Sequence, residues 1–148
     1  MSFSTLTKTT LIGLSLMSGV ALAADHRVAM LNQGADGAMV FEPGYLAVAP
    51  GDTVTFVPTD SGHNTVSVLS PDQGTTWRGD FGEAVTVTLN QEGVYLYQCD
   101  PHLPLGMVGV IQVGKGTNLE DARAQAAKLE EGMAMNQGRL EHYLDQVH

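Results

Sequence analysis

The sequence is poor in cysteine and in basic side chains. Its 148 residues include one Cys, and 7 Lys and Arg stand against 16 Asp and Glu, so the formal net charge is −9. A single cysteine excludes an intrachain disulfide framework. The few basic residues are scattered along the chain, which leaves no basic surface to neutralise the phosphates of a nucleic acid. Nucleic-acid binding is therefore excluded, and the one thiol, Cys99, is either an inert core residue or a metal ligand.

The sequence also lacks a hydrophobic run long enough to span a membrane, which takes about 20 apolar residues. One apolar stretch, Leu11–Leu22, follows Lys8, and small residues occupy the two positions that signal peptidase reads in the Ala-Leu-Ala at 21–23. We expect residues 1–23 to be a signal peptide that is cleaved after Ala23 or one residue later. The mature protein would then be periplasmic and free of membrane spans. An uncleaved membrane anchor is the alternative interpretation.

Aromatic residues make up only 6% of the chain, but apolar residues make up 43%, which is enough for the core of one domain. Short runs of β-branched and aromatic residues, separated by Gly, Pro, Asp and Asn, predict a series of strands. These are Arg27–Leu31, Met39–Phe41, Tyr45–Val48, Thr53–Val57, Thr65–Leu69, Ala84–Leu89, Val94–Tyr97 and Val108–Val113. Their regular spacing predicts an all-β sandwich or barrel, with residues 70–82 as a long loop around a buried Trp77.

After Gly116 the spacing of the apolar residues becomes helical. Residues 117–120 (Thr-Asn-Leu-Glu) fit a capping box at the start of a helix, and a second short helical pattern covers residues 140–147. Neither helix is long enough to be stable alone in water, so both are expected to pack on the sandwich. We therefore expect one domain, with the β-sandwich over residues 24–116 and a C-terminal helical extension over residues 117–148.

The residues with the most specific chemistry lie between the last two predicted strands. Cys99, His102 and Met107 form the pattern Cys-x2-His-x4-Met in a loop anchored at both ends, and His63 follows a turn farther upstream. One thiolate and two imidazoles with a weak thioether ligand make the arrangement of a blue-copper electron-transfer site. Zinc is the main rival metal, but a thioether is not among its usual ligands. The pattern therefore predicts one copper ion per chain, cycling between Cu(II) and Cu(I).

Each of these residues also has a purely structural interpretation. Cys99 could be a buried thiol, the two histidines could be ordinary hydrogen-bonded polar residues, and Met107 could fill a gap in the core. An exported compartment oxidises thiols, so a free Cys99 has to be buried or bound to a metal. The copper interpretation accounts for all four residues at once. The remaining histidines are expected to be solvated: His26, His142 and His148.

At these residues the sequence resembles the pseudoazurins, small periplasmic blue-copper proteins of the cupredoxin family. The segments that carry the resemblance are residues 28–32 (VAMLN), 37–43 (GAMVFEP), 50–56 (PGDTVTF), 62–64 (GHN), the loop from Cys99 to Met107, and the helical extension. The resemblance implies a Greek-key β-sandwich of the cupredoxin type. It also implies a copper site at one end of the sandwich, with the ligands His63, Cys99, His102 and Met107.

The resemblance further implies two contacts behind the ligands. Asn64 is expected to tie the ligand loops together by hydrogen bonds. Asn32 is expected to place a backbone N–H near the thiolate sulfur. Contacts of this kind orient metal ligands and tune the metal.

Together these features predict a monomeric electron carrier that is not an enzyme. The resemblance implies periplasmic redox partners, such as copper nitrite reductase in denitrification or a c-type cytochrome. Pseudoazurins are described with a lysine-rich copper end, whereas this chain has Ser61 and Gln98 where lysines are expected. An acidic carrier is expected to prefer a neutral or basic docking face, or to dock through the apolar residues 103–106.

The sequence leaves two other functions open. A copper chaperone or storage protein would use exposed ligands that release the metal. A copper enzyme would need an open coordination position and usually more histidine, and the sequence has no second histidine cluster.

Overall fold

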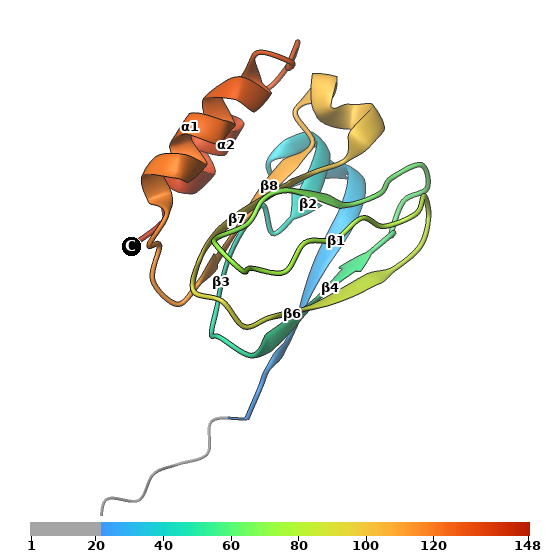
Figure 1. Ribbon diagram of the computed structural model, residues 1–148. Helices are drawn as coiled ribbons and strands as arrows, with labels where there is room; N and C mark the ends of the chain where they lie inside the picture. Colours follow the sequence, from blue (N-terminus) through green and yellow to red (C-terminus); the bar gives the residue numbers. More distant parts are fainter. Residues whose placement is uncertain (1–21) are drawn as a thin grey trace, which may run out of the picture.

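The computed structural model describes residues 22–148, and positions 1–21 of the predicted signal peptide lie outside the described residues. The strands are β1 (Asp25–Gly34), β2 (Gly37–Glu42), β3 (Tyr45–Val48), β4 (Asp52–Val57), β5 (Val66–Leu69), β6 (Val85–Leu89), β7 (Gly93–Gln98) and β8 (Val108–Val113). A 3₁₀-helix, η1 (Asp100–Leu105), lies between β7 and β8, and α1 (Leu119–Glu130) and α2 (Arg139–Leu144) follow. Figure 1 shows both α-helices on one side of the strands. No helix within residues 22–148 is long and apolar enough to cross a membrane.

The strands form two four-stranded sheets, with the orders β2-β1-β4-β6 and β3-β8-β7-β5. The pairs β1·β4 and β3·β8 are parallel, and the other strand pairs are antiparallel. The chain passes from one sheet to the other after β2, β3, β4, β5 and β6. This is the sandwich of the cupredoxin type with two short C-terminal helices, so the predicted fold class is confirmed.

Two predicted strands, Tyr45–Val48 and Val108–Val113, have the same bounds in the structure. The predicted capping box is wrong. The N-cap residue of α1 is Asn118, and its side chain makes no hydrogen bond to the helix. Asn118 instead accepts a hydrogen bond from the Val94 N–H at 2.6 Å and donates one to the Val94 C=O at 3.0 Å. The residue therefore fastens the start of α1 to β7.

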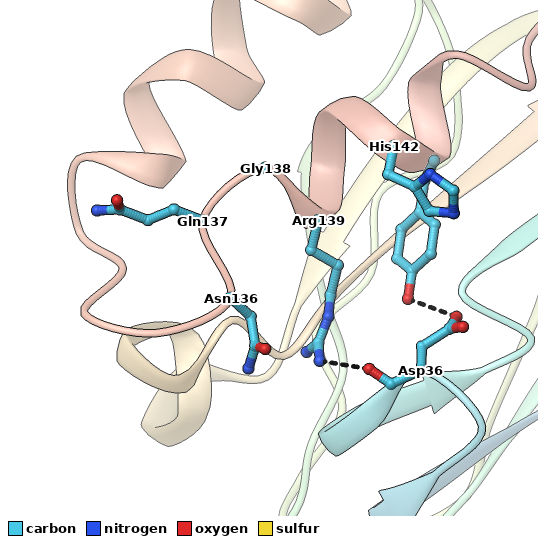
Figure 2. A pocket seen from close by; sticks show the side chains of 7 residues that line it. Asp36, Asn136, Gln137, Gly138, Arg139 and His142 are labelled. Atoms are coloured by element: carbon cyan, nitrogen blue, oxygen red, sulfur yellow. Dashed lines mark hydrogen bonds between the residues drawn. The ribbon is translucent and has the colours of Figure 1, made fainter.

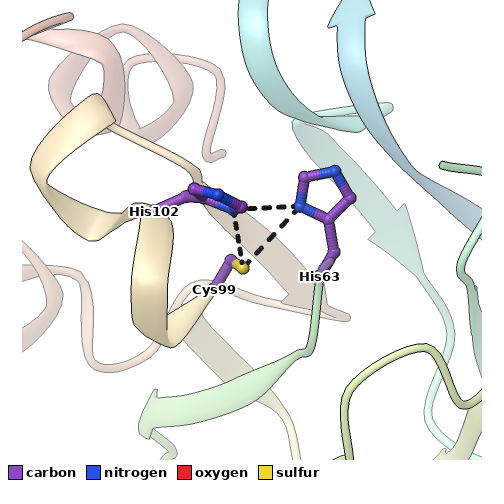
Figure 3. A group of neighbouring side chains, drawn as sticks. All are labelled: His63, Cys99 and His102. Atoms are coloured by element: carbon purple, nitrogen blue, oxygen red, sulfur yellow. Dashed lines mark hydrogen bonds between the residues drawn. The ribbon is translucent and has the colours of Figure 1, made fainter. Parts of the chain in front are cut away.

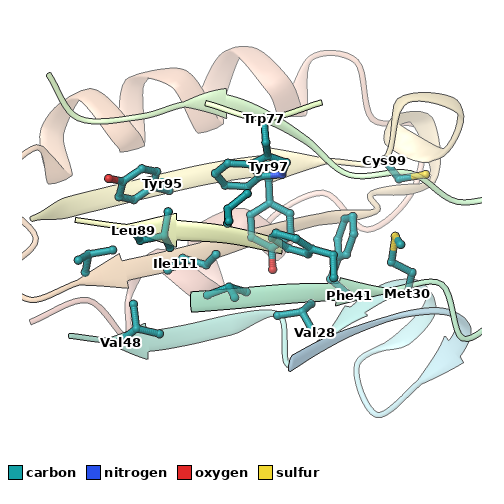
Figure 4. Close-up of a cluster of buried hydrophobic side chains, with 14 of the residues drawn as sticks. Val28, Met30, Phe41, Val48, Trp77, Leu89, Tyr95, Tyr97, Cys99 and Ile111 are labelled. Carbon is teal, nitrogen blue, oxygen red and sulfur yellow. The ribbon is translucent and has the colours of Figure 1, made fainter. Parts of the chain in front are cut away.

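The core between the sheets is built around aromatic side chains (Figure 4). Tyr97 is fully buried and packs edge-on against Phe56, with ring centroids 4.9 Å apart. Trp77 stacks on Phe56 at 5.4 Å, as expected for a buried residue of the long loop. Each such aromatic pair contributes about 0.5–1.5 kcal/mol beyond the burial of its area. Cys99 and Met107 belong to the same cluster, so two of the predicted ligands are continuous with a rigid core.

The helices cover the outer face of the β3-β8-β7-β5 sheet (Figure 1). Successive side chains of a strand point to opposite faces. In β7, Tyr95 and Tyr97 therefore lie in the core between the sheets, whereas Val94 and Leu96 join the cluster under the helices. Because both faces of β7 are covered, its residues are apolar without alternation. This layering holds the chain rigidly on both sides of the loop that begins at Cys99.

Candidate metal centre

Two loops at one end of the sandwich bring three of the predicted ligands together (Figure 3). His63 precedes β5, Cys99 directly follows β7, and His102 lies in η1. His63 Nδ1 is 3.1 Å from His102 Nδ1 and 3.9 Å from Cys99 Sγ, and Cys99 Sγ is 3.4 Å from His102 Nδ1. Within residues 22–148, no other group of three His, Cys, Asp or Glu side chains has its ligand atoms so close together.

The loop from Cys99 to Met107 is closed by its own backbone hydrogen bonds. The Cys99 N–H donates to the Met107 C=O at 3.0 Å, and the Met107 N–H donates to the His102 C=O at 3.1 Å. Gly106 ends η1 in the left-handed conformation, with φ 75°, and a Cβ there would lie 2.8 Å from Asn136 Cβ. Since β7 and β8 pair on either side of the loop, Met107 is held fully buried at the end of the core.

A hydrogen bond on the far side of the His63 ring fixes its tautomer. His63 Nε2 lies 3.0 Å from Asn32 Oδ1. A carbonyl oxygen only accepts, so Nε2 carries the proton and Nδ1 keeps its lone pair. Burial lowers the pKa of His63, the charge of His102 lowers it further, and the carboxylate of Asp60 opposes both. The neutral ring thus presents Nδ1 to Cys99 and His102, as a metal ligand must.

The Cys99 sulfur is completely buried and lies near two backbone amides. Burial raises the pKa of the Cys99 thiol, the backbone N–H groups of Asn64 and His102 lower it, and the charge of Asp100 raises it further. A metal ion deprotonates a thiol that coordinates it. The two amides would then stabilise the thiolate.

The structure corrects the role expected for Asn32. Its backbone N–H donates to Asp60 Oδ2 at 2.7 Å, so this N–H is not directed at the sulfur. The amide that approaches Cys99 is that of Asn64, the residue after the ligand His63. Asn32 supports the site through its side chain, by the bond to His63.

Asn64 joins the two ligand loops, which is the contact that the resemblance implied. Its Oδ1 accepts from the Asp100 N–H at 2.9 Å, and its Nδ2 lies 3.3 Å from Asp100 Oδ2. Asp100 also accepts hydrogen bonds from Arg78 Nη1 at 2.6 Å and from Gln98 Nε2 at 3.2 Å. Burial opposes ionisation, but the hydrogen bonds from Gln98, Arg78 and Asn64 hold the pKa of Asp100 below its usual range. Sequence reasoning missed Arg78 and Asp100; the one available signal was a carboxylate between two predicted ligands.

The remaining histidines lie apart from this group. His142 and His148 are exposed, as expected. The prediction of a solvated His26 is wrong, because its Nε2 lies 2.8 Å from Oδ2 of the buried Asp52.

The site offers one thiol, two imidazoles and a neighbouring thioether. Soft sulfur ligands with imidazole suit copper in both oxidation states.

The sequence is similar to those of known copper proteins. A family model described as copper binding proteins of the plastocyanin/azurin family matches residues 28–114. The pseudoazurin of Methylorubrum extorquens is 36% identical over 151 aligned residues, which cover 99% of each chain. This chain belongs to the pseudoazurin family. The pseudoazurin of Paracoccus pantotrophus is 40% identical over 115 residues, covering 76% of this chain and 79% of that one.

The solved structures agree with the sequences. Native pseudoazurin from Hyphomicrobium denitrificans matches with a TM-score of 0.73 at 37% identity, covering 84% of this chain and 98% of that chain. As a pseudoazurin, the protein carries one copper ion and is an electron carrier of the cupredoxin type. Redox proteins are therefore its partners.

Proposed function

We propose that His63, Cys99, His102 and Met107 are the copper ligands, and that the protein is a soluble, monomeric carrier of single electrons in the periplasm. The observation that supports this most directly is the convergence of one thiol and two imidazole nitrogens in loops that the sandwich anchors. Residues 1–23 would be removed as a signal peptide. Residues 24–116 would then form the copper-binding sandwich, with residues 117–148 as its helical extension.

Bound copper supplies the one-electron couple, and the chain supplies a fixed set of ligands. His63 is oriented by Asn32, and the two loops are tied together by Asn64. Fixed contacts behind the ligands keep their geometry the same in both oxidation states. His63, Cys99 and Met107 are each 0% exposed, whereas His102 is partly exposed. The edge of His102 is therefore the route by which electrons enter and leave.

Replacing His102 with alanine is expected to separate copper binding from electron exchange. The other ligand side chains are buried and remain, so the variant still binds copper when imidazole is added. Electron self-exchange is expected to slow by about tenfold or more, which corresponds to about 1.4 kcal/mol added to the barrier. NMR line broadening in mixtures of oxidised and reduced protein measures this rate, with His142→Ala as the matched control. An unchanged rate in His102→Ala would exclude this route.

Apolar side chains lie next to the two loops that carry His63 and His102. Leu103–Leu105 follow it directly. Phe81 is 60% exposed and Met135 is 53% exposed. Both are fixed next to the ligand loops, because the Gly82 N–H donates to the His63 C=O at 2.9 Å and the Met135 N–H donates to the Pro104 C=O at 3.1 Å. These groups form an apolar docking rim.

The charges next to this rim are acidic. Asp80 and Glu83 are exposed on either side of Phe81, and the charge of Asp60 acts on His63, where it opposes the lowering of the His63 pKa by burial and by His102. Complementary charge increases the rate of encounter and selects the partner. The partner face would therefore be basic, as on a basic c-type cytochrome. Copper nitrite reductase, and with it a role in denitrification, is proposed only if its docking face is neutral or basic.

The partner assignment predicts a definite dependence on salt. With a basic c-type cytochrome as acceptor, the second-order rate of electron transfer is expected to fall several-fold as ionic strength rises, because salt screens the attraction. Replacing Asp80 with Asn and Glu83 with Gln is expected to lower the rate at low salt and flatten this dependence. Stopped-flow kinetics measures both effects. A rate that rises with salt would contradict an acidic docking face.

Copper delivery is the alternative function, and the burial of the site disfavours it. A protein that hands copper to a recipient needs ligands that a recipient can reach. Here three of the four proposed ligands are completely buried. We therefore expect the copper to remain bound in the presence of a competing chelator.

A further inference from the structure

A second buried ionisable group lies at the start of β4 and takes no part in the copper site. Asp52 is 6% exposed, and three donors converge on its carboxylate. The Ala24 N–H donates to Oδ1 at 2.8 Å, the Ala49 N–H donates to Oδ2 at 3.0 Å, and His26 Nε2 lies 2.8 Å from Oδ2. These contacts, led by the one from Ala24, lower the pKa of Asp52 to about 2.

The carboxylate is thus ionised and buried, yet no Lys or Arg among residues 22–148 forms an ion pair with it. Its partners are two neutral amides and one imidazole. Two other ionisable groups lie near this end of β1: Asp25, which accepts a hydrogen bond from the Thr53 hydroxyl, and the exposed Arg27. A buried carboxylate is costly unless a cation compensates it. Among residues 22–148, Asp52 therefore has no permanently charged cation as a partner.

We propose that Asp52 is the binding site for the α-ammonium group of Ala24, which forms when the chain is cut between Ala23 and Ala24. This inference rests on the proposed export of the protein. Hydrolysis breaks the peptide bond, adds the hydroxyl of water to the Ala23 carbonyl carbon, and leaves an amine on Ala24. That amine takes up a proton near neutral pH. The atom already 2.8 Å from the carboxylate thereby changes from a neutral amide to a cation.

The backbone of Ala24 is already positioned for this role. Its C=O accepts a hydrogen bond from the Thr53 N–H at 2.9 Å, and the next residue, Asp25, pairs with Thr53 in the parallel ladder of β1 and β4. Leu22, Ala23 and Ala24 are all exposed, and of these three residues Ala24 is the one whose N–H donates to Asp52. The contact with Asp52 thus begins at Ala24.

The contact between Ala24 and Asp52 also favours one of the two cleavage positions that the sequence allows. Cleavage after Ala23 places the new ammonium group against Asp52 Oδ1. Cleavage one residue later would remove Ala24 and leave this oxygen without that donor. We therefore assign the mature N-terminus to Ala24.

The test compares the copper-loaded mature chain with the same chain acetylated at Ala24. The acetyl group mimics the Ala23 carbonyl, so the N–H and its hydrogen bond remain while the charge is lost. Hydrogen bonds to charged groups are roughly twice as strong as neutral ones. The equilibrium constant for folding, measured by urea denaturation near neutral pH, is expected to be about tenfold larger for the free amine. In an Asp52→Asn background, acetylation is expected to have no effect.

Two results would overturn the proposal: equal stability of the free and acetylated chains, or the same difference in the Asp52→Asn background. Mass spectrometry of the exported protein adds an independent criterion, because a mature chain that begins at any residue other than Ala24 would also contradict it. Strand β1 begins at the end of the sandwich opposite η1 (Figure 1). The free-amine, acetylated and Asp52→Asn chains are therefore all expected to keep the same copper spectrum. Loss of that spectrum would instead count against the proposed copper carrier.

Discussion

Replacing Cys99 with serine is expected to abolish the intense visible absorption of the copper-loaded protein. That absorption arises from charge transfer between a thiolate sulfur and copper, and a serine hydroxyl does not supply the soft anionic ligand. His63 and His102 remain, so copper still binds, but as an ordinary centre with a wide EPR hyperfine splitting. Titration of the purified mature protein with one equivalent of Cu(II), followed by absorption and EPR spectroscopy, measures both effects.

His142→Ala is the matched control for this experiment. His142 is an exposed histidine on α2 and is not part of the ligand group, so its loss should leave colour and hyperfine splitting unchanged. A coloured Cys99→Ser variant would remove the assignment of the thiolate as a ligand. A pale wild-type protein would remove the electron-carrier proposal as a whole, and copper delivery would then be the function to test.

The residues of the site could be predicted because they are chemically rare and close together in sequence. Cys99, His102 and Met107 occupy one loop, and the strands on both sides are apolar enough to be recognised. The structure brings His63 to this loop from a separate part of the chain, with ring nitrogens 3.1 Å apart. The spacing of these residues in the sequence and the chemistry of their donor atoms were sufficient to predict that they lie together.

The contacts behind the ligands could not be predicted in the same way. Whether a backbone N–H points at a sulfur depends on the backbone dihedral angles at that residue. A neighbouring carboxylate can also accept the hydrogen bond in place of the sulfur. The N–H of Asn32 donates to Asp60, whereas the backbone N–H that acts on the Cys99 thiol from this side is that of Asn64. Similarly, the ion pair of Arg78 with Asp100 joins residues from separate loops, and the Cys-x2-His-x4-Met pattern specifies neither residue.

The start of α1 shows the same limit of prediction from sequence. The residues at 117–120 satisfy the capping pattern, but a side chain bonds the nearest unsatisfied backbone group, wherever that group lies. For Asn118 that group is on β7, at Val94. A tertiary contact therefore replaced the local one that the sequence favoured, while the helix itself still formed where its apolar spacing predicted.

The helical extension depends on one buried arginine, which lines a cavity of about 310 Å³ together with Asp36 and Tyr143 (Figure 2). Arg139 begins α2 and is 8% exposed. Its guanidinium donates to four backbone carbonyls, those of Asp36, Ala38, Met39 and Gly106, at distances between 2.6 and 3.3 Å. Met39 has φ 51°, an uncommon conformation for a residue other than glycine. The Arg139 side chain therefore connects α2 to the turn between β1 and β2, to strand β2, and to the end of the loop from Cys99 to Met107.

Truncation of Arg139 to alanine is expected to lower the free energy of unfolding by about 3 kcal/mol, because buried carbonyls are left without donors. Arg139→Lys should restore only part of this stability, since an ammonium group cannot reach the carbonyls as a planar fork does. Arg123→Ala is the matched control. Arg123 also bridges to α2, through Glu141 and Asp145, but exposed ion pairs contribute about 0–1 kcal/mol.

Urea denaturation of the three variants measures these differences. Equal losses for Arg139→Ala and Arg123→Ala would mean that the guanidinium acts as a surface charge and not as an anchor. Because Gly106 directly precedes Met107, the carbonyl that Arg139 holds at 2.6 Å also belongs to the loop of the proposed ligands. The alanine variant is therefore expected to lose copper faster than wild type, so the extension outside the sandwich contributes to holding the ligand loop in place.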